Sequence, residues 1–357
     1  MKIVFLNIYN GLVERGAERS THELANRLAE NHKVWVVQGG SRLLSKAKYK
    51  IKIIPTFLPN FPDSSFSFLR RFYLDIWSLQ ILFFSIRLIP LLLSERFNIV
   101  IPVNGGWQTV LCKLLAWLRY SKLVIIGRAG KGRDDRWNLL WRPDLFIALT
   151  NYAYAWVKKI APKIKCELIP NGVDLNLFRP QREKAEVALK RPIILCVGAL
   201  MPNKQIDLTI KATAKLKDVS LLILGKGILK NDLLELGNKL LEKDRFLILS
   251  VPYKEIPKYY RIAHVFTLVS KTGEAFGNVY LEALASNLPI VATDDTTRRE
   301  IVGGAGIFVD PNNIDQYADA LNTMLNKNIG NMPIDQSSKF SWEKIASKYE
   351  KTFLSLS

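Results

Sequence analysis

Two glutamates, Glu274 and Glu282, lie eight residues apart within residues 270–293, on either side of a glycine, Gly277. Carboxylates accept hydrogen bonds from hydroxyl groups, and a sugar is rich in such donors. Two acceptors that flank a helix start would suit a phosphorylated sugar whose phosphates lie between them. The alternative is an ordinary surface loop and helix with solvated glutamates, which two glutamates alone do not exclude.

A helix is expected to begin near Phe276, because the apolar residues that follow Asn278 recur at helical spacing, and Asn287 with Pro289 would end it. The first backbone N–H groups of a helix have no acceptor inside it, and the helix dipole favours an anion at that end. A phosphate could therefore bind at this helix start, where Gly277 leaves room for its approach.

Short apolar runs separated by helical patterns extend along most of the chain. In the first half, we expect strands at residues 3–7, 34–37, 51–54, 99–103, 124–126 and 145–149, with a helix at 17–30. After Pro170 the alternation restarts, with runs at 193–197, 221–224, 246–249, 265–268 and 289–292. This alternation predicts two doubly wound, Rossmann-like α/β domains that face a central cleft, with ligands at the carboxyl ends of the strands.

Several segments, taken together with the two glutamates, resemble the retaining glycosyltransferases of family 4. The spacing of Glu274 and Glu282 matches the E-x7-E signature of that family. The other matching segments follow the order of the family: residues 169–174 with Phe178 and Pro180, residues 196–200 with Lys204, residues 221–227, and residues 340–343. The resemblance is specific from about residue 165 to 350 and looser before that.

The resemblance implies the GT-B architecture, with an acceptor-binding domain at residues 1–178 and a nucleotide-sugar-binding domain at 179–340. A last helix, at 341–357, would pack back toward the first domain. The implied reaction moves a sugar from a UDP-, GDP- or ADP-sugar to a hydroxyl acceptor, such as a lipid-linked or polysaccharide precursor, with retention at the anomeric carbon. No metal or other cofactor is expected, because a lysine and a helix dipole would stabilise the leaving group and the chain has no Asp-x-Asp motif.

The resemblance also implies roles for individual residues. Glu282 would hold the ribose hydroxyls and Glu274 the sugar or phosphate side, while Lys204 would oppose the charge of the diphosphate as it leaves. The other residues expected to bind the donor are Phe276, Gly277, Asn278 and Val279 at the helix start, Gly198 and Gly225 after strands, and Val251 and Pro252 against the base.

Three positions depart from the pattern of the family. The family usually has two adjacent glycines after the first strand, where this chain has Arg15 and Gly16. We expect Gly16 to contact a phosphate or the acceptor, with a plain βα turn as the alternative. Ala199 replaces an arginine that helps to neutralise the leaving group, and Arg128 stands where the family often has a histidine. Arg128, with Lys131, is predicted to hold phosphate and to supply the missing cation; the surrounding loop lacks the spacing of an ATPase loop.

The composition is that of a folded protein with room for two domains, since 48% of the 357 residues are hydrophobic and 23% are charged. The three cysteines lie in apolar segments without metal-ligand spacing, which is typical of a reducing compartment. The N-terminus becomes polar too soon for a signal peptide and is typical of a first strand. A cytoplasmic location is therefore expected.

Positive charge is concentrated in the first half of the chain. Residues 1–180 carry 27 Lys and Arg against 12 Asp and Glu, whereas residues 181–357 carry 24 against 20. Basic and aromatic residues at 66–73 precede a strongly apolar stretch at 76–93, which Arg87 interrupts. Arg87 argues against a membrane-spanning helix. The pattern suits attachment to an anionic membrane surface, and equally a buried helix with a solvated basic face.

Two other functions stay open. A pI near 9.7 would attract nucleic acid, but no nucleic-acid partner is expected, because no helix-turn-helix, zinc-finger or aromatic RNA-binding motif is present. The departures at Ala199 and Arg128 leave room for a sugar-nucleotide epimerase or a non-catalytic relative on the same fold. The sequence does not identify the donor sugar, its base, the acceptor or the oligomeric state.

Overall fold

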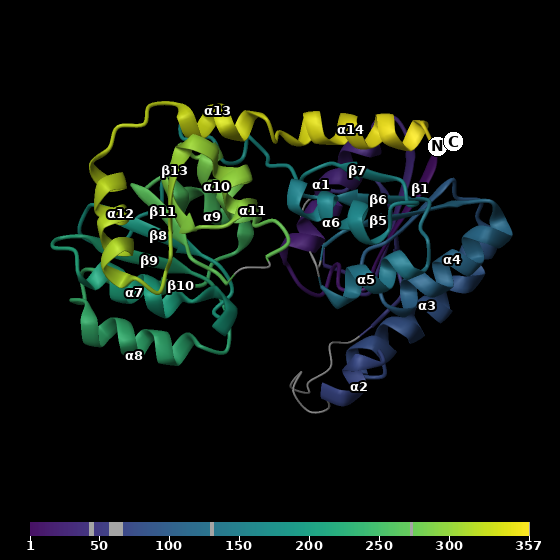
Figure 1. Ribbon diagram of the computed structural model, residues 1–357, viewed down its shortest axis with the longest axis horizontal. Coiled ribbons are helices and arrows are strands. Elements are labelled where there is room, and N and C mark those ends of the chain that lie inside the picture. Colours follow the sequence, from purple (N-terminus) through teal and green to yellow (C-terminus); the bar gives the residue numbers. More distant parts are fainter. Residues whose placement is uncertain (43–45, 57–66, 129–131, 272–273, 357) are drawn as a thin grey trace. The chain divides into compact units, whose positions relative to one another are not determined.

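The computed structural model describes residues 1–42, 46–56, 67–128, 132–271 and 274–356. The chain divides into two compact units, one formed by residues 1–171 with the segment from Trp342 onward, and one formed by Gly172–Ser341 (Figure 1). The division comes earlier than the one expected at residue 178. Phe178 explains the difference, because its buried ring packs against Tyr253 and Tyr260 of the second unit.

The first unit is built on a parallel sheet, which has seven strands among the described residues in the order β3-β2-β1-β4-β5-β6-β7. Its strands are β1 (Lys2–Asn7), β2 (Lys33–Gln38), β3 (Lys50–Ile53), β4 (Ile99–Pro102), β5 (Lys122–Ile126), β6 (Leu145–Ala148) and β7 (Cys166–Leu168). Its helices are α1 (Gly16–Leu28), α2 (Ser67–Arg71), α3 (Ile76–Ser94), α4 (Trp107–Arg119), α5 (Arg133–Leu140), α6 (Asn151–Ile160) and α14 (Trp342–Leu354).

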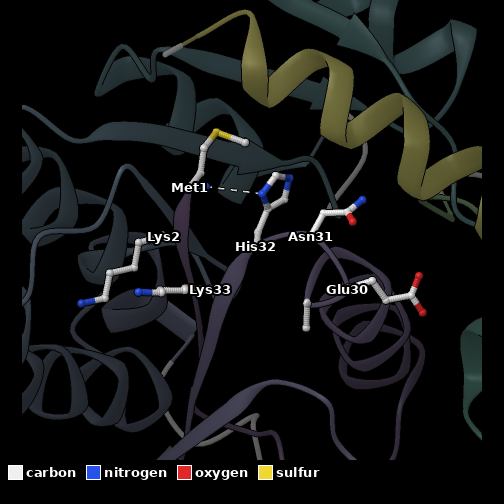
Figure 2. Close-up of a pocket in the computed structure, with 7 residues that line it drawn as sticks. Met1, Lys2, Glu30, Asn31, His32 and Lys33 are labelled. Carbon is white, nitrogen blue, oxygen red and sulfur yellow. Dashed lines mark hydrogen bonds between the residues drawn. The ribbon is translucent and has the colours of Figure 1, made fainter.

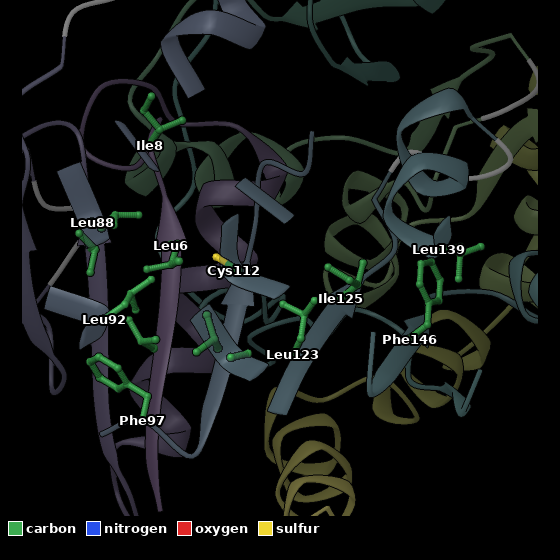
Figure 3. Packing of buried hydrophobic residues seen from close by; sticks show 14 of the residues in the cluster. Leu6, Ile8, Leu88, Leu92, Phe97, Cys112, Leu123, Ile125, Leu139 and Phe146 are labelled. Atoms are coloured by element: carbon green, nitrogen blue, oxygen red, sulfur yellow. The ribbon is translucent and has the colours of Figure 1, made fainter. Parts of the chain in front are cut away.

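One face of this sheet is covered by α3, α4, α5 and α6, which bury a shared hydrophobic core. Leu6 of β1 packs there with Leu88 and Leu92 of α3 and with Cys112 of α4 (Figure 3). Helix α1 packs against β1 and β2 and against the C-terminal helix α14. Arg27 of α1 also pairs with Glu343 of α14 at 3.1 Å, so the end of the chain belongs to the first unit.

The second unit has a parallel sheet of six strands among the described residues, in the order β10-β9-β8-β11-β12-β13. Its strands are β8 (Ile193–Val197), β9 (Ser220–Leu224), β10 (Phe246–Leu249), β11 (Val265–Leu268), β12 (Ile290–Thr293) and β13 (Gly306–Val309). Its helices are α7 (Ile206–Ala214), α8 (Lys230–Leu240), α9 (Ile256–Tyr260), α10 (Asn278–Ala285), α11 (Thr296–Val302), α12 (Ile314–Asn326) and α13 (Met332–Ser338), with a 3-10 turn, η1 (Pro202–Lys204), after β8.

The two parallel-sheet α/β domains predicted from the sequence are confirmed. The predicted strand positions agree with the observed ones to within about two residues, but β7 and β13 were not predicted. Both lie at the edge of a sheet. An edge strand buries less of its surface, so these short segments lack the long apolar run that marks a central strand.

Helix α10 begins two residues later than expected, and Gly277 is its N-cap residue. The φ angle of Gly277 is +97°, a region that L-residues with a side chain rarely occupy. A Cβ atom at this position would also lie 2.7 Å from the ring of Tyr280. Gly198, after β8, has neither constraint. Its φ angle lies outside this region, and the nearest neighbour of a Cβ atom there would be a methyl of Leu268 at 3.6 Å.

We expect Gly277→Ala to lower the free energy of unfolding of the second unit by about 1–3 kcal/mol, because alanine would be strained in this backbone conformation. Urea denaturation followed by far-ultraviolet circular dichroism measures the loss. Gly198→Ala is the matched control and should cost less than about 1 kcal/mol. Equal losses in the two variants would contradict this account of the helix start.

Candidate functional site

The predicted donor site lies at the point where the strand order of the second sheet changes direction. The chain passes from β8 to β9 on one side and from β11 to β12 on the other, so the segments after β8 and β11 emerge side by side. Ligands of open α/β sheets bind at such a point, beside the carboxyl ends of the strands. The two segments are joined directly, because the backbone N–H of Lys271 donates to the carbonyl of Asn203 at 2.9 Å.

Glu274 lies at the centre of this meeting point and is surrounded by donors. Lys204 donates from Nζ to Oε1 of Glu274 at 2.5 Å, and Ser270 donates from Oγ to Oε2 at 2.6 Å. Arg298 donates from Nη2 to the same Oε2 at 3.2 Å. Burial alone would raise the pKa of Glu274, but Lys204, Ser270 and Arg298 outweigh it and hold the pKa below its usual value. The carboxylate is therefore charged and fixed in orientation.

Arg298 of α11 is the functional candidate that sequence reasoning missed. Its side chain is only 1% exposed, and its guanidinium also donates to the carbonyl of Ser270 at 3.2 Å and to the hydroxyl of Tyr280 at 3.3 Å. Asp295, the N-cap of α11, forms an ion pair with it. Burial would lower the pKa of Arg298, but Tyr280, Asp295 and Glu274 raise it above its usual value. The pattern Arg298-Arg299 gives no sign of which arginine is buried.

Glu282 lies on the second turn of α10 and is buried. Tyr253 donates to its Oε1 at 3.3 Å, and Tyr260 donates to its Oε2 at 3.0 Å. These tyrosines fix the orientation of the carboxylate, and the sequence alone did not reveal them. Val251 and Pro252 directly precede Tyr253 on the segment after β10, where Pro252 is exposed.

The remaining predicted residues of the second unit gather at the same strand ends. Phe276 is buried and packs edge-to-face on Phe340, while Asn278 and Val279 form the first turn of α10 and are half-buried. Gly225 follows β9, and a Cβ atom there would lie 2.0 Å from the carbonyl oxygen of Gly198. Gly225 thus has a packing reason to be glycine. Contact between Gly225 and the sugar nucleotide stays a prediction, and so do the binding roles of Phe276, Asn278 and Val279.

Arg128 and Gly16 belong to the first unit, where the structure brings them to the same helix. Gly16 is the exposed first residue of α1. Arg128 follows β5 and donates from Nη1 to the carbonyl of Ala17 at 2.7 Å and to the hydroxyl of Ser20 at 3.0 Å. Burial lowers the pKa of Arg128. Its predicted phosphate-binding role is untested, and Lys131, predicted beside it, lies outside the described residues.

A surface hollow of about 550 Å³ in the first unit is a different place. It is lined by Met1, Lys2, Ala29, Glu30, Asn31, His32 and Lys33 (Figure 2). These residues lie at the amino ends of β1 and β2, opposite the strand ends where ligands of such sheets bind. Within the described ranges, no group of three or more His, Cys, Asp or Glu residues is placed to hold a metal ion.

Comparison with known proteins extends over both units. Residues 178–339 match the family model "Glycosyl transferases group 1", and residues 15–177 match the model "Glycosyltransferase Family 4". The chain is 38% identical over 235 residues to N-acetylgalactosamine-N,N'-diacetylbacillosaminyl-diphospho-undecaprenol 4-alpha-N-acetylgalactosaminyltransferase of Campylobacter jejuni, covering 63% of this chain and 57% of that protein.

A second relative is GDP-mannose-dependent alpha-(1-6)-phosphatidylinositol monomannoside mannosyltransferase of Mycolicibacterium smegmatis, which is 29% identical over 203 residues, 51% of this chain and 53% of that protein. The chain thus spans about half the length of the curated relatives it matches.

The solved structure of Anabaena Alr3699/HepE in complex with UDP and glucose has a TM-score of 0.78 and 18% identity, over 99% of this chain and 100% of that one. At that identity the likeness concerns the fold, which is GT-B in both. With two family models that together span residues 15–339, the chain belongs to the family 4 glycosyltransferases of the GT-B fold.

Proposed function

We propose that this protein is a retaining glycosyltransferase, which moves a sugar from a nucleotide-diphosphate sugar to a hydroxyl acceptor. In this reaction the bond between the anomeric carbon and the diphosphate oxygen breaks, and the diphosphate leaves with the electron pair. The acceptor oxygen bonds to the same carbon, on the face that the diphosphate left, and its proton passes to the departing diphosphate oxygen. The observation that carries the proposal is the charged Glu274 carboxylate, fixed between Lys204 and Arg298 beside the start of α10.

The start of α10 would bind the diphosphate. The backbone amides at the start of a helix lie at the positive end of its dipole, so those of Gly277 and Asn278, with that of Phe276 just before them, suit phosphate oxygens. Lys204 lies close enough to Glu274 to share its charge between the carboxylate and a phosphate. Charge that builds up on the leaving oxygen would then be stabilised more in the transition state than in the ground state.

The fixed carboxylates would orient the two sugars of the donor. Glu282 would accept hydrogen bonds from the ribose hydroxyls, since an ionised carboxylate can accept about four hydrogen bonds and Tyr253 and Tyr260 orient its two oxygens. Glu274 would do the same for the transferred sugar. The base would lie against Val251 and Pro252.

Arg298 is a second cation, with Lys204, in a site where Ala199 replaces the arginine of the family. The family places an arginine after the glycine that follows β8, and the exposed Ala199 cannot supply that charge. Arg298 brings a guanidinium to the same group of side chains from α11 and holds Glu274 in place. We propose that it acts as a positioning residue, which fixes the Glu274 carboxylate and with it the side chain of Lys204. Arg128 is the alternative source of the cation, which unchanged donor affinity in an Arg128→Ala variant would rule out.

The acceptor is proposed to be lipid-linked or a polysaccharide precursor. Support comes from the relatives, whose names specify a diphospho-undecaprenol and a phosphatidylinositol acceptor. An enzyme with such an acceptor would work in the cytoplasm at the inner face of the membrane. We also propose that the reaction needs no metal, because Lys204 and the α10 dipole would stabilise the leaving group.

A panel of UDP-, GDP- and ADP-sugars tests the function as a whole. The full chain should release one nucleoside diphosphate when a lipid-linked acceptor is added, at a rate that a chelator does not change. The product should have the anomeric configuration of the donor by NMR. Binding of a sugar nucleotide without any release of the diphosphate would favour a non-catalytic relative, whereas a changed sugar on an intact nucleotide would favour an epimerase.

Lys204→Ala should weaken donor binding about ten-fold or more, or on the order of 1.4 kcal/mol, because a cation facing the diphosphate is lost. Isothermal titration with the donor that the panel identifies measures the change. Lys211→Ala is the matched control, since Lys211 forms an exposed pair with Asp207 on α7. Glu282→Ala should weaken binding as well. If Lys204→Ala and Glu282→Ala both leave the affinity unchanged, the donor binds elsewhere.

Arg298→Met should lower the free energy of unfolding by about 3 kcal/mol or more, because it leaves Glu274 and Asp295 without their buried partner. Arg299→Met, its neighbour on α11, is the control. It removes an exposed pair with Asp294 and should cost no more than about 1 kcal/mol.

The Arg298→Met loss should shrink in a Glu274→Gln background, because only Asp295, and no longer Glu274, is then a carboxylate that loses its arginine partner. Arg298→Lys, which keeps the charge, should recover part of the donor affinity that Arg298→Met loses. Urea denaturation and titration of the donor measure these effects. An Arg298→Met loss as small as that of Arg299→Met would show that the arginine does not hold the site together.

A further inference from the structure

Helix α3 of the first unit is strongly apolar. It has 19 residues and a mean hydropathy of 1.9, so by length and composition it could cross a membrane. Only 22% of that span is buried inside the structure. A helix that is apolar all round is normally enclosed by protein or by lipid. The exposed positions of α3 have neither around them within the described part of the chain.

The inner side of α3 packs against the rest of the first unit. Phe84 packs into the hydrophobic core of the first unit. Leu88 and Leu92 do the same (Figure 3). The outer side carries Phe83 and Ile86, three residues apart, and Leu93 two turns further on, all of them exposed. Phe83 has 63% of its surface exposed, although burying a phenylalanine is worth about 2 kcal/mol in water.

Helix α4 extends this outer surface. It packs beside α3 on the same face of the sheet, with Cys112 and Ala116 turned into the shared core. Leu114, Trp117 and Leu118 point the other way, and Trp117 is 76% exposed. We call the outward side chains of the two helices the α3–α4 face: Phe83, Ile86, Leu93, Leu114, Trp117 and Leu118. It is larger than the scattered single apolar residues of an ordinary surface.

The segment that carries the α3–α4 face has an excess of positive charge. Residues 67–122, which contain both helices, carry seven Lys and Arg against two Asp and Glu. Both acids are engaged, since Asp75 caps α3 and Glu95 pairs with Lys2. Arg71 and Arg96 are exposed before and after α3, and Arg87 is exposed in its middle. An exposed tryptophan and other apolar side chains, together with exposed arginines along α3 and at its two ends, suit a lipid surface whose head groups are anionic and whose interior is apolar.

We propose that the α3–α4 face binds the surface of an anionic lipid bilayer, with α3 lying in the plane of the interface. An interfacial helix usually turns a polar side toward water. In α3 the side away from the bilayer packs instead against the core of the first unit. Arg87 and its neighbours would reach the lipid head groups, while Phe83 and Trp117 enter the acyl boundary.

Two other arrangements fit less well. To span the bilayer, α3 would have to leave the core and take Phe84, Leu88 and Leu92 with it, as well as Arg87. To pair with a second copy of the chain, a two-fold contact would bring the same cations together from both sides, which is unfavourable. An anionic partner matches both the apolar side chains and the charge.

This inference deepens the proposed function, and it rests on that function only for its purpose, which is to bring the enzyme to a lipid-linked acceptor. Binding to lipid can be measured with neither donor nor acceptor present. A failure of the surface proposal can therefore be told apart from a failure of the proposed reaction, which the donor panel tests on its own.

The test is flotation of the full chain with vesicles of phosphatidylcholine alone and of phosphatidylcholine mixed with phosphatidylglycerol. The protein should float with the anionic vesicles and be released by salt. Phe83→Ser with Trp117→Ser should lower the partition coefficient about ten-fold or more. Arg71→Gln with Arg96→Gln should lower it about five-fold for each charge removed, on anionic vesicles only.

Matched controls come from the second unit. Ile228→Ser removes an apolar side chain that is 75% exposed, and Lys239→Gln with Lys243→Gln removes two exposed charges. These variants should bind vesicles like the unaltered chain, and all variants should keep its melting temperature and donor affinity.

The proposal is overturned if the unaltered chain does not bind anionic vesicles at low salt, or if Ile228→Ser weakens binding as much as the α3–α4 variants do. It is also overturned if the chain sediments as a dimer that Trp117→Ser separates while vesicle binding persists. Retention in membranes after alkaline carbonate extraction would indicate a spanning helix instead.

Discussion

A carboxylate that is removed from water needs cations and hydrogen-bond donors around it, and this requirement organises the second unit. Glu274 meets it with Lys204 from the segment after β8, Ser270 from the segment after β11, and Arg298 from α11. Three separate parts of the chain are joined through one side chain. The segments at the change of strand direction are therefore held in register with the start of α10, where a phosphate would bind.

Close contacts of the backbone fix the strand ends of both units. In the second unit, the glycine after β9 lets its backbone approach the carbonyl of Gly198 more closely than any side chain would permit. In the first unit, the segments after β1 and β4 also meet where the strand order changes direction, and the backbone N–H of Ile8 donates to Asn104 at 2.9 Å. Each sheet thus builds a fixed edge at the place where ligands of α/β folds bind.

The two units differ in what their surfaces offer. The second unit gathers its buried charges into a small network around Glu274, and its half of the chain is close to neutral. The first unit carries most of the excess positive charge, together with two helices whose outer sides are apolar. In an enzyme that joins a soluble charged donor to a lipid-linked acceptor, such a division would place the two kinds of recognition in separate domains. The family resemblance would explain the first kind, and the proposed role of the α3–α4 face would account for the second.

The sequence by itself determined the alternation of strands and helices, and with it the two parallel sheets, because short apolar runs separated by helical periods have few other ways to be buried. It also determined the spacing of Glu274 and Glu282 and, to within two residues, the start of α10. Only the tertiary structure decided which of the adjacent arginines, Arg298 or Arg299, is buried against Glu274. Only the tertiary structure assigned Phe84 to the core and Phe83 to the outside. Neighbouring residues of the same type are alike in the sequence, and what separates them is the packing around a helix, which depends on residues far away in the chain.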